Sequence, residues 1–386
     1  MPYMSDAMGP STTTPTHPLA IPVVWSADCL RHEPKGEVWL GVMTPGTELP
    51  ERAHVIRAEL ESAGAPVVDA RRHGDQTLHA VHDRGLLDFL EHGYRQWAEA
   101  GLFAAVAEWS GPEPVDRVVP YVFPTAGMVD GLPLREPAGI HGRAGRYGYD
   151  TMTLIGPGTW LAARAAVDVA LTAVDLVGSG HAAAYALCRP PGHHVTHDAY
   201  GGSCYLNNAA VAAQALRESG SRRVAIVDID AHHGNGTQMV FYDRSDVFYG
   251  SLHVDPGAGW FPHYAGYADE SGRGEGAGTN LNLPLPEGTP DDDWLAAVDR
   301  IVDAVGRFGA DAVVVSLGVV AAVDDPESPL RVTHDGYRAA GDRIGRLGLP
   351  TVAVQEGGYH LPTLGTLVRS CLTGLQSGLA VTGGIS

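Results

Sequence analysis

Short apolar runs rich in β-branched residues alternate with longer amphipathic segments in the second half of the chain. The runs at 224–227, 311–316 and 351–354 are almost uninterrupted, which is typical of parallel strands buried on both faces. The patterns at 207–218, 290–308 and 333–346 predict helices between them. This alternation predicts an α/β fold with a mostly parallel central sheet and helices on both faces.

Polar or glycine-containing motifs follow each predicted strand. Asp230 and His232 follow the run at 224–227, Val320 follows 311–316, and Tyr359 follows 351–354. Ligands of such folds bind beyond the carboxyl ends of the strands. The three motifs are therefore expected to meet at one site.

The organisation of the chain indicates one domain. Its 386 residues are 44% hydrophobic, which supports a substantial core, and no interdomain linker or repeat is visible. We expect a flexible leader at 1–20, which lacks the pattern of a signal peptide, and a domain at 21–386. Residues 112–150, rich in Pro, Gly and Arg, are too long for an ordinary connection and are predicted to form an insertion at a pocket rim or a subunit contact.

Charge and cysteine content narrow the partners and the compartment. The net charge of −19 argues against nucleic acid and agrees with a cationic substrate, although a solvated acidic surface also explains it. The four cysteines form no CxxC pair and no disulfide framework, so a reducing cytoplasm is expected. No apolar stretch reaches the roughly 18 residues that a membrane helix needs, and no membrane association is expected.

The motifs at the strand ends carry residue types suited to metal-assisted hydrolysis. Asp230 and His232 are two residues apart and project to the same side of an extended segment, which supplies two of the three protein ligands of a typical catalytic zinc. His193 and His194 lie in a rigid Arg-Pro-Pro-Gly-His-His turn, and Tyr359 follows two glycines. Each motif alone also has an ordinary structural explanation, but their convergence favours a site.

Seven motifs together resemble the histone deacetylase superfamily, and within it the bacterial acetylpolyamine amidohydrolases. The motifs are Glu-Pro-Lys-Gly-Glu-Val at 33–38, Ala-Val-His-Asp at 80–83, Arg-Pro-Pro-Gly-His-His at 189–194, Cys-Tyr-Leu-Asn-Asn at 204–208, the segment 227–237, Ser-Leu-His at 251–253 and Glu-Gly-Gly-Tyr at 356–359. The resemblance runs from about Asp28 to Leu375 and implies an arginase-like α/β fold. Gly234 stands where the binuclear manganese site of arginases needs an aspartate, so one metal is expected.

The resemblance implies catalytic roles for five residues. His194 would be the general base toward a zinc-bound water, and His193 would be its partner in proton transfer. Asp228 and Asn235 would orient the two histidines. Tyr359 would donate a hydrogen bond to the oxyanion of the tetrahedral intermediate.

The resemblance also implies two metal sites and a substrate tunnel. Asp230, His232 and the residue at position 320 would bind one zinc ion. A structural potassium ion would be held by Asp228, Asp230, His232, Ser251 and Leu252, largely through carbonyl groups. Phe261, Ser203 and Gly202 would line the tunnel.

The sequence departs from the family pattern at its third zinc ligand. The family has aspartate in Ser-Leu-Gly-x-Asp, and this chain has Val320. We expect low zinc occupancy and very weak hydrolysis, since an isopropyl group offers no lone pair. Three interpretations stay open: one altered residue in an otherwise functional deacetylase, which is favoured, a non-catalytic relative, or a rearranged site in which Asp324 or Asp325 turns inward.

The predicted substrate is a small, cationic N-acetylated amine such as an acetylpolyamine. Ser203 replaces an aromatic residue usual in the family and is expected to widen the tunnel. The insertion at 112–150 resembles a loop that narrows the entrance and contributes to a homodimer in acetylpolyamine amidohydrolases. Its carboxylates are candidates for attracting a cationic chain: Glu113, Asp116, Asp130 and Glu136. The alternatives are a protein acetyl-lysine deacetylase and a non-catalytic binding protein on the same fold.

Overall fold

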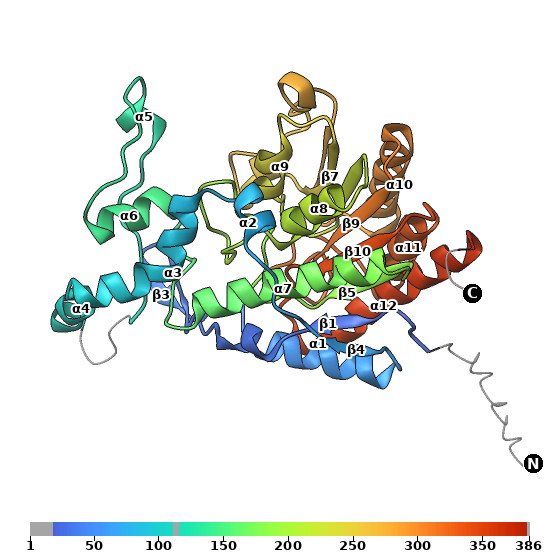
Figure 1. The fold of residues 1–386 in the computed structure, drawn as a ribbon, viewed down its shortest axis with the longest axis horizontal. Coiled ribbons are helices and arrows are strands. Elements are labelled where there is room, and N and C mark those ends of the chain that lie inside the picture. Colours follow the sequence, from blue (N-terminus) through green and yellow to red (C-terminus); the bar gives the residue numbers. More distant parts are fainter. Residues whose placement is uncertain (1–17, 111–115, 384–386) are drawn as a thin grey trace, which may run out of the picture.

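A parallel sheet forms the centre of the molecule (Figure 1). The computed structural model describes residues 18–110 and 116–383. Within these ranges the sheet has eight strands in the order β4-β1-β5-β10-β9-β6-β7-β8, and every neighbouring pair is parallel. The strands are β1 (Val23–Trp25), β4 (Val67–Asp69), β5 (Ala183–Ala186), β6 (Val224–Asp228), β7 (Val247–Val254), β8 (Asn280–Leu285), β9 (Ala312–Leu317) and β10 (Thr351–Gln355).

Helices cover both faces of the sheet, as the alternating pattern predicts. One layer holds α2 (Gln76–Val81), α3 (Arg84–Glu99), α7 (Thr159–Gly178) and α8 (Asn208–Glu218). The other holds α1 (Glu51–Ser62), α10 (Asp291–Phe308), α11 (His334–Gly345) and α12 (Leu361–Val381). The remaining helices are α4 (Leu102–Ser110), α5 (Ala126–Val129), α6 (Ile140–Tyr147) and α9 (Asn235–Phe241).

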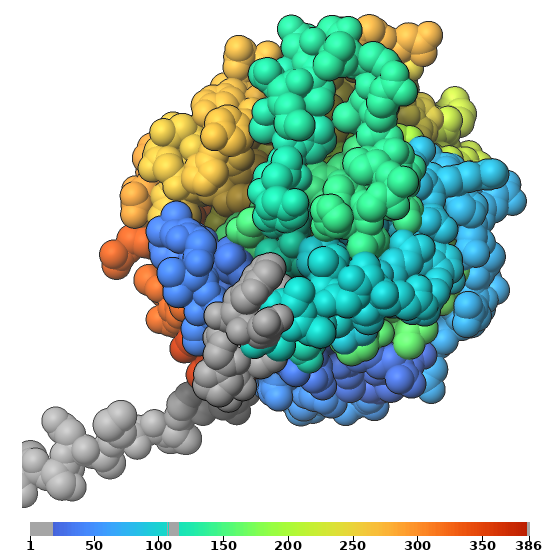
Figure 2. Space-filling model, turned by 90° about the vertical axis from the view of Figure 1, so that its left-hand side faces the viewer, coloured from blue at the N-terminus to red at the C-terminus, as the bar shows by residue number. Residues whose placement is uncertain are grey.

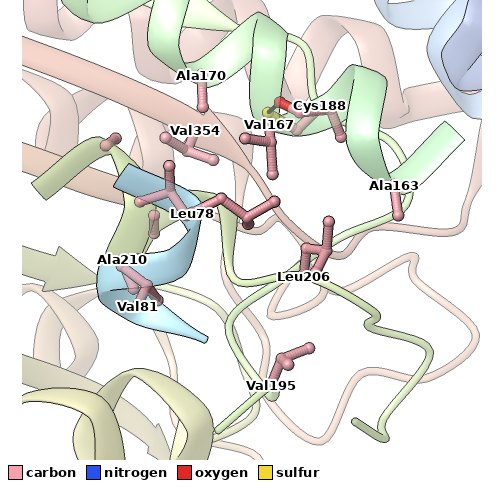
Figure 3. Packing of buried hydrophobic residues seen from close by; sticks show 14 of the residues in the cluster. Leu78, Val81, Ala163, Val167, Ala170, Cys188, Val195, Leu206, Ala210 and Val354 are labelled. Carbon is pink, nitrogen blue, oxygen red and sulfur yellow. Dashed lines mark hydrogen bonds between the residues drawn. The ribbon is translucent and has the colours of Figure 1, made fainter. Parts of the chain in front are cut away.

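The strand sequences explain this arrangement. Successive side chains of β6 point to opposite faces, so Val224 and Ile226 join one buried cluster while Ala225 and Val227 join the other. Figure 3 shows the first cluster, in which Val354 of β10 lies among residues of α2 and α7. The three predicted strands and three predicted helices are therefore confirmed to within one or two residues.

Helices α8, α10 and α11 each begin or end at a capping residue. The side chain of Asn207 accepts a hydrogen bond from the N–H of Ala210 at the start of α8, and Thr333 caps α11 through Gly336 in the same way. Helix α10 has three aspartates in its first turn and ends at Gly309, whose φ of 72° places it in the left-handed region.

The segment predicted as an insertion leaves the body of the molecule. Residues 120–139, here termed the arm, project with α5 at their far end, and α6 then returns to pack against α3 (Figure 1). Figure 2 shows the arm on the face that also carries the antiparallel hairpin of β2 (Glu37–Trp39) and β3 (Val42–Thr44). Residues 1–17 of the predicted leader at 1–20 lie outside the described residues, as do residues 111–115, which include Glu113. No helix in the described part of the chain is long and apolar enough to span a bilayer.

Candidate active site

The carboxyl ends of three adjacent strands bring the predicted site residues together. Asp228 ends β6 beside Ser316 of β9, and the segment after β10 bonds back to β9 through Glu356 N–H and the carbonyl oxygen of Leu317, 3.0 Å apart. The loop after β5 carries the histidine pair into the same region. The sheet order therefore places the carboxyl ends of β5, β10, β9 and β6 next to one another, where ligands of such folds bind.

The two histidines are each held by one partner. His193 Nδ1 lies 3.0 Å from Asp228 Oδ2, and His194 Nδ1 lies 2.8 Å from Asn235 Oδ1. Burial alone would lower the pKa of His193, but the adjacent Asp228 carboxylate raises it to about 10. Burial and the neighbouring His193 keep the pKa of His194 well below its usual range. The pair thus combines a protonated imidazole with a neutral one.

The predicted tunnel residues surround His194. The Phe261 ring meets the His194 ring edge-on with centroids 4.8 Å apart. Gly202, with φ of 59°, lies between them: a Cβ there would stand 2.5 Å from His194 Cδ2 and 2.9 Å from Phe261 Cε1. Only glycine fits this position. Ser203 follows, and its N–H donates to Thr153 Oγ1 at 2.8 Å.

Asp230 and Val320 lie side by side at the predicted metal position. A Cβ built on Gly357 would stand 2.5 Å from Val320 Cγ2 and 2.8 Å from Asp230 Oδ2. Both oxygens of Asp230 accept backbone hydrogen bonds, from His232 N–H at 2.9 Å and Gly357 N–H at 3.1 Å. Val320 is only 1% exposed and belongs to the second hydrophobic cluster.

The residues present do not fit a catalytic zinc ion. Such an ion normally has three protein ligands, and here the side chains of Asp230 and His232 are the donors that the strand end supplies. Among residues 18–110 and 116–383, no group of three or more His, Cys, Asp and Glu side chains is arranged to hold a metal ion. The apolar contacts of Val320 take the place of the missing donor.

The structure does not support the interpretation in which Asp325 completes the metal site. Asp325 Oδ2 accepts hydrogen bonds from the N–H groups of Tyr359, at 2.6 Å, and His360, at 3.2 Å. Its Oδ1 accepts one from Glu327 N–H at 3.0 Å. Both oxygens therefore hold backbone, and the Asp324 side chain is exposed to solvent.

Tyr359 is positioned by its backbone and by Arg52. The guanidinium of Arg52 lies 4.8 Å from the centre of the Tyr359 ring and donates to the Gly358 carbonyl oxygen at 2.6 Å. Gly358 has φ of 130°, a conformation that favours glycine. Burial raises the pKa of Tyr359 well above its usual range, so the phenol stays protonated and can donate a hydrogen bond.

The predicted potassium residues fall on the neighbouring strands β6 and β7 and on the loop that follows β6. Asp228 of β6 is in register with Ser251 of β7, and Leu252 follows it. Ser251 Oγ lies 2.8 Å from His253 Nδ1. The potassium site stays a prediction, since these contacts engage the serine hydroxyl within the chain.

The structure adds wall residues that the sequence reasoning missed. Tyr149 OH donates to the His194 carbonyl oxygen at 2.9 Å. The Tyr149 and Phe261 rings are stacked, with their centroids 6.4 Å apart. Asp150 Oδ2 accepts the N–H of Gly202 at 2.6 Å. Both residues end the predicted insertion, where the Gly-Tyr-Asp sequence offered no distinctive signal.

Two of the candidate cation-attracting carboxylates are already paired. Asp116 bonds Lys35 at 3.0 Å and Arg117 at 2.7 Å, and Glu136 bonds Arg143 at 2.6 Å. Asp130 is exposed on the arm. Of the described members of this set, Asp130 thus has the fewest competing contacts.

Comparison with known proteins assigns the family. Residues 47–375 match the histone deacetylase domain. The chain is 43% identical to the acetylpolyamine amidohydrolase of Mycoplana ramosa, over 92% of this chain and 99% of the relative, and 40% identical to acetylpolyamine amidohydrolase 1 of Pseudomonas aeruginosa, over 92% and 98%. The crystal structure of an acetylpolyamine aminohydrolase from Burkholderia pseudomallei matches with a TM-score of 0.84 at 41% identity, covering 93% of this chain and 99% of that one. The chain belongs to the histone deacetylase domain family and is similar to acetylpolyamine amidohydrolases along nearly its whole length.

Proposed function

We propose that this protein is an amidohydrolase for small N-acetylated amines of the acetylpolyamine type, and that Val320 reduces its hydrolysis to a very low rate. The observation that carries the proposal is the pairing of His193 with Asp228 and of His194 with Asn235. The Tyr359 hydroxyl approaches the same point next to Gly357 as Asp230 and Val320. Relatives named as acetylpolyamine amidohydrolases at about 40% identity support the substrate class.

The chain's own residues would perform the proton transfers of amide hydrolysis. The neutral His194 would accept a proton from the attacking water, and the protonated His193 would supply one to the leaving amine. Tyr359 would donate its hydroxyl proton in a hydrogen bond to the carbonyl oxygen as negative charge develops there. Phe261 and Gly202 would hold the acyl group against His194.

Val320 would limit this reaction because the position of a family metal ligand is apolar. Mutation of a residue that hydrogen-bonds to a metal ligand typically lowers metal affinity or activity about 10- to 100-fold. Loss of a direct ligand is expected to lower them more. Restoring the carboxylate in Val320→Asp is therefore expected to raise deacetylation of an acetylpolyamine at least about 100-fold.

A second candidate function is binding of an acylated amine without hydrolysis. One observation favours it: each carboxylate oxygen of Asp230 accepts a hydrogen bond from a backbone N–H, and Val320 belongs to the buried hydrophobic cluster. Asp230 thus has hydrogen-bond partners within the chain without a cation. Under this alternative, Val320→Asp would gain neither metal nor activity.

The test compares an acetylspermidine with an acetyl-lysine peptide as substrates of the unmodified chain and of Val320→Asp. The proposal expects hydrolysis by the variant with a preference for the acetylspermidine. Preference for the peptide would identify a protein deacetylase instead. An inactive variant that still binds the acetylspermidine in calorimetry would identify the binding protein.

We also propose a homodimer that forms through the arm. Large apolar side chains are exposed there, with Tyr121 at 69% and Leu132 at 66%, and Trp39 of the neighbouring hairpin is 55% exposed. Leu132→Glu is expected to shift the mass measured by light scattering from dimer to monomer. A monomeric unmodified chain would contradict the proposal.

All four cysteines are buried and free, which supports a reducing compartment such as the cytoplasm.

A further inference from the structure

Glu356 is a buried acid at the heart of the site to which the proposed reaction gives no role. It follows β10 directly and precedes the two glycines that lead to Tyr359. Its side chain is fully buried. None of the described Lys, Arg and His side chains forms an ion pair with it, whereas the buried acid Glu48 is paired with Arg52 and Arg189.

The Glu356 carboxylate joins two loops that are far apart in the sequence. Its Oε2 accepts hydrogen bonds from the N–H of Gly192 at 2.7 Å and from the N–H of His193 at 3.1 Å. These two groups belong to the turn that presents both histidines. One oxygen atom therefore links the segment of Tyr359 to the segment of His193 and His194.

Other contacts fix the position of the turn and of the Glu356 backbone. A Cβ on Gly192 would stand 2.5 Å from Asn208 N and from the Leu206 carbonyl oxygen, so the turn has no room to move toward α8. On the opposite side, Arg52 donates to the Glu356 carbonyl oxygen at 2.6 Å. His193 is consequently held at its backbone by Glu356 and at its ring by Asp228.

Stability of the fold alone does not explain an acid at this position. Glu356 Oε1 is buried and has no hydrogen-bond partner among the described residues. Burial raises the pKa of Glu356 to about 7, which reflects the unfavourable environment of the charged form. The ionised carboxylate is therefore less favourable in the folded protein than in the unfolded chain.

We propose that Glu356 is a positioning residue that clamps the Gly192–His193 turn and thereby sets the histidine pair against Tyr359. It acts through two backbone N–H groups and does not touch the substrate. Its catalytic consequence rests on the proposed function, whereas the clamp itself is a property of the fold.

Hydrogen–deuterium exchange tests the clamp without any metal or activity. Hydrogen bonds to a charged group contribute about 1.5–3 kcal/mol, so Glu356→Ala should speed exchange of the Gly192 and His193 amides roughly 10- to 100-fold. Glu356→Gln keeps the shape and a neutral acceptor and should speed it about fivefold. Glu327→Gln, which removes a carboxylate bonded to Thr47 rather than to this turn, is the matched control and should leave these amides unchanged.

The catalytic consequence is tested by kinetics in the Val320→Asp background. Adding Glu356→Ala should lower kcat about 10- to 100-fold with KM changed less than about threefold, and adding Glu356→Gln should recover part of kcat. If Val320→Asp alone is inactive, the proposed function fails while exchange still decides the clamp. The proposal is overturned if the two amides exchange at the unmodified rate in Glu356→Gln. It is also overturned if Glu356→Ala leaves kcat unchanged. If Glu356→Ala does not fold, both measurements are made on Glu356→Gln.

Discussion

Val320→Asp should make the stability of this fold depend on zinc. The substitution removes a buried isopropyl group, whose burial stabilises by about 1.5–3 kcal/mol. It also sets a second carboxylate beside Asp230, because both side chains approach the same point next to Gly357. Two like charges about 5 Å apart repel by about 3 kcal/mol at an effective dielectric constant of 20. The metal-free variant should therefore lose about 4.5–6 kcal/mol of stability.

Zinc should reverse this loss in the variant and leave the unmodified chain unchanged. At a free concentration 1,000 times its Kd, a ligand that binds only the folded state adds about 4 kcal/mol. A change of this size corresponds to roughly 5–10 °C in Tm for a chain of this length. Thermal melts with chelator and with added zinc measure the difference directly.

Val320→Asn is the matched control for these melts. It loses the same isopropyl group but brings no charge, so its Tm should fall less than that of Val320→Asp in chelator and should rise little with zinc. The reasoning is refuted if the unmodified chain gains as much from zinc as the aspartate variant does. It is also refuted if the aspartate variant melts at the same temperature with chelator and with zinc.

Three further predictions concern the phenol, the tunnel and pH. In the Val320→Asp background, Tyr359→Phe should lower kcat about 100- to 1,000-fold with little change in KM, and an unchanged kcat would remove Tyr359 from the reaction. Ser203→Tyr in that background should reduce kcat/KM for bulky acyl groups more than for acetyl, and an equal loss for both would contradict a widened tunnel. Burial lowers the pKa of His32 to about 3 and of His82 to about 4. Both histidines should thus stabilise the fold in their neutral forms above pH 6.5, and this contribution is lost as pH falls toward the lowered pKa values. For His82 the loss is about 3 kcal/mol. The free energy of unfolding measured in urea should therefore decline less between pH 6.5 and 4 in His82→Gln than in the unmodified chain.

The strands near the site were predictable because of where they lie in the sheet. Strands β6, β9 and β10 are buried on both faces, so their sequences are continuous apolar runs. The edge strand β4 and its neighbour β1 have three residues each, which is too short for a periodicity to emerge. Their positions follow from pairing across the sheet rather than from local sequence.

The site residues were predictable where their chemistry is local, and not where it depends on distant partners. The spacing of Asp230 and His232 makes them candidate ligands, because residues two apart project to the same side of an extended segment. Asp325 was considered as a substitute metal ligand, and its engagement with the N–H of Tyr359 became visible only in three dimensions. The same is true of Glu356, whose partner His193 lies 163 residues away in the sequence.

Zinc per chain, measured by elemental mass spectrometry on the unmodified protein and on Val320→Asp purified side by side, tests the central claim most directly. The account predicts almost no zinc in the unmodified chain and about one ion per chain in the variant. One zinc ion per chain in both proteins would show that another group replaces the lost carboxylate, and the explanation of weak hydrolysis by Val320 would be wrong.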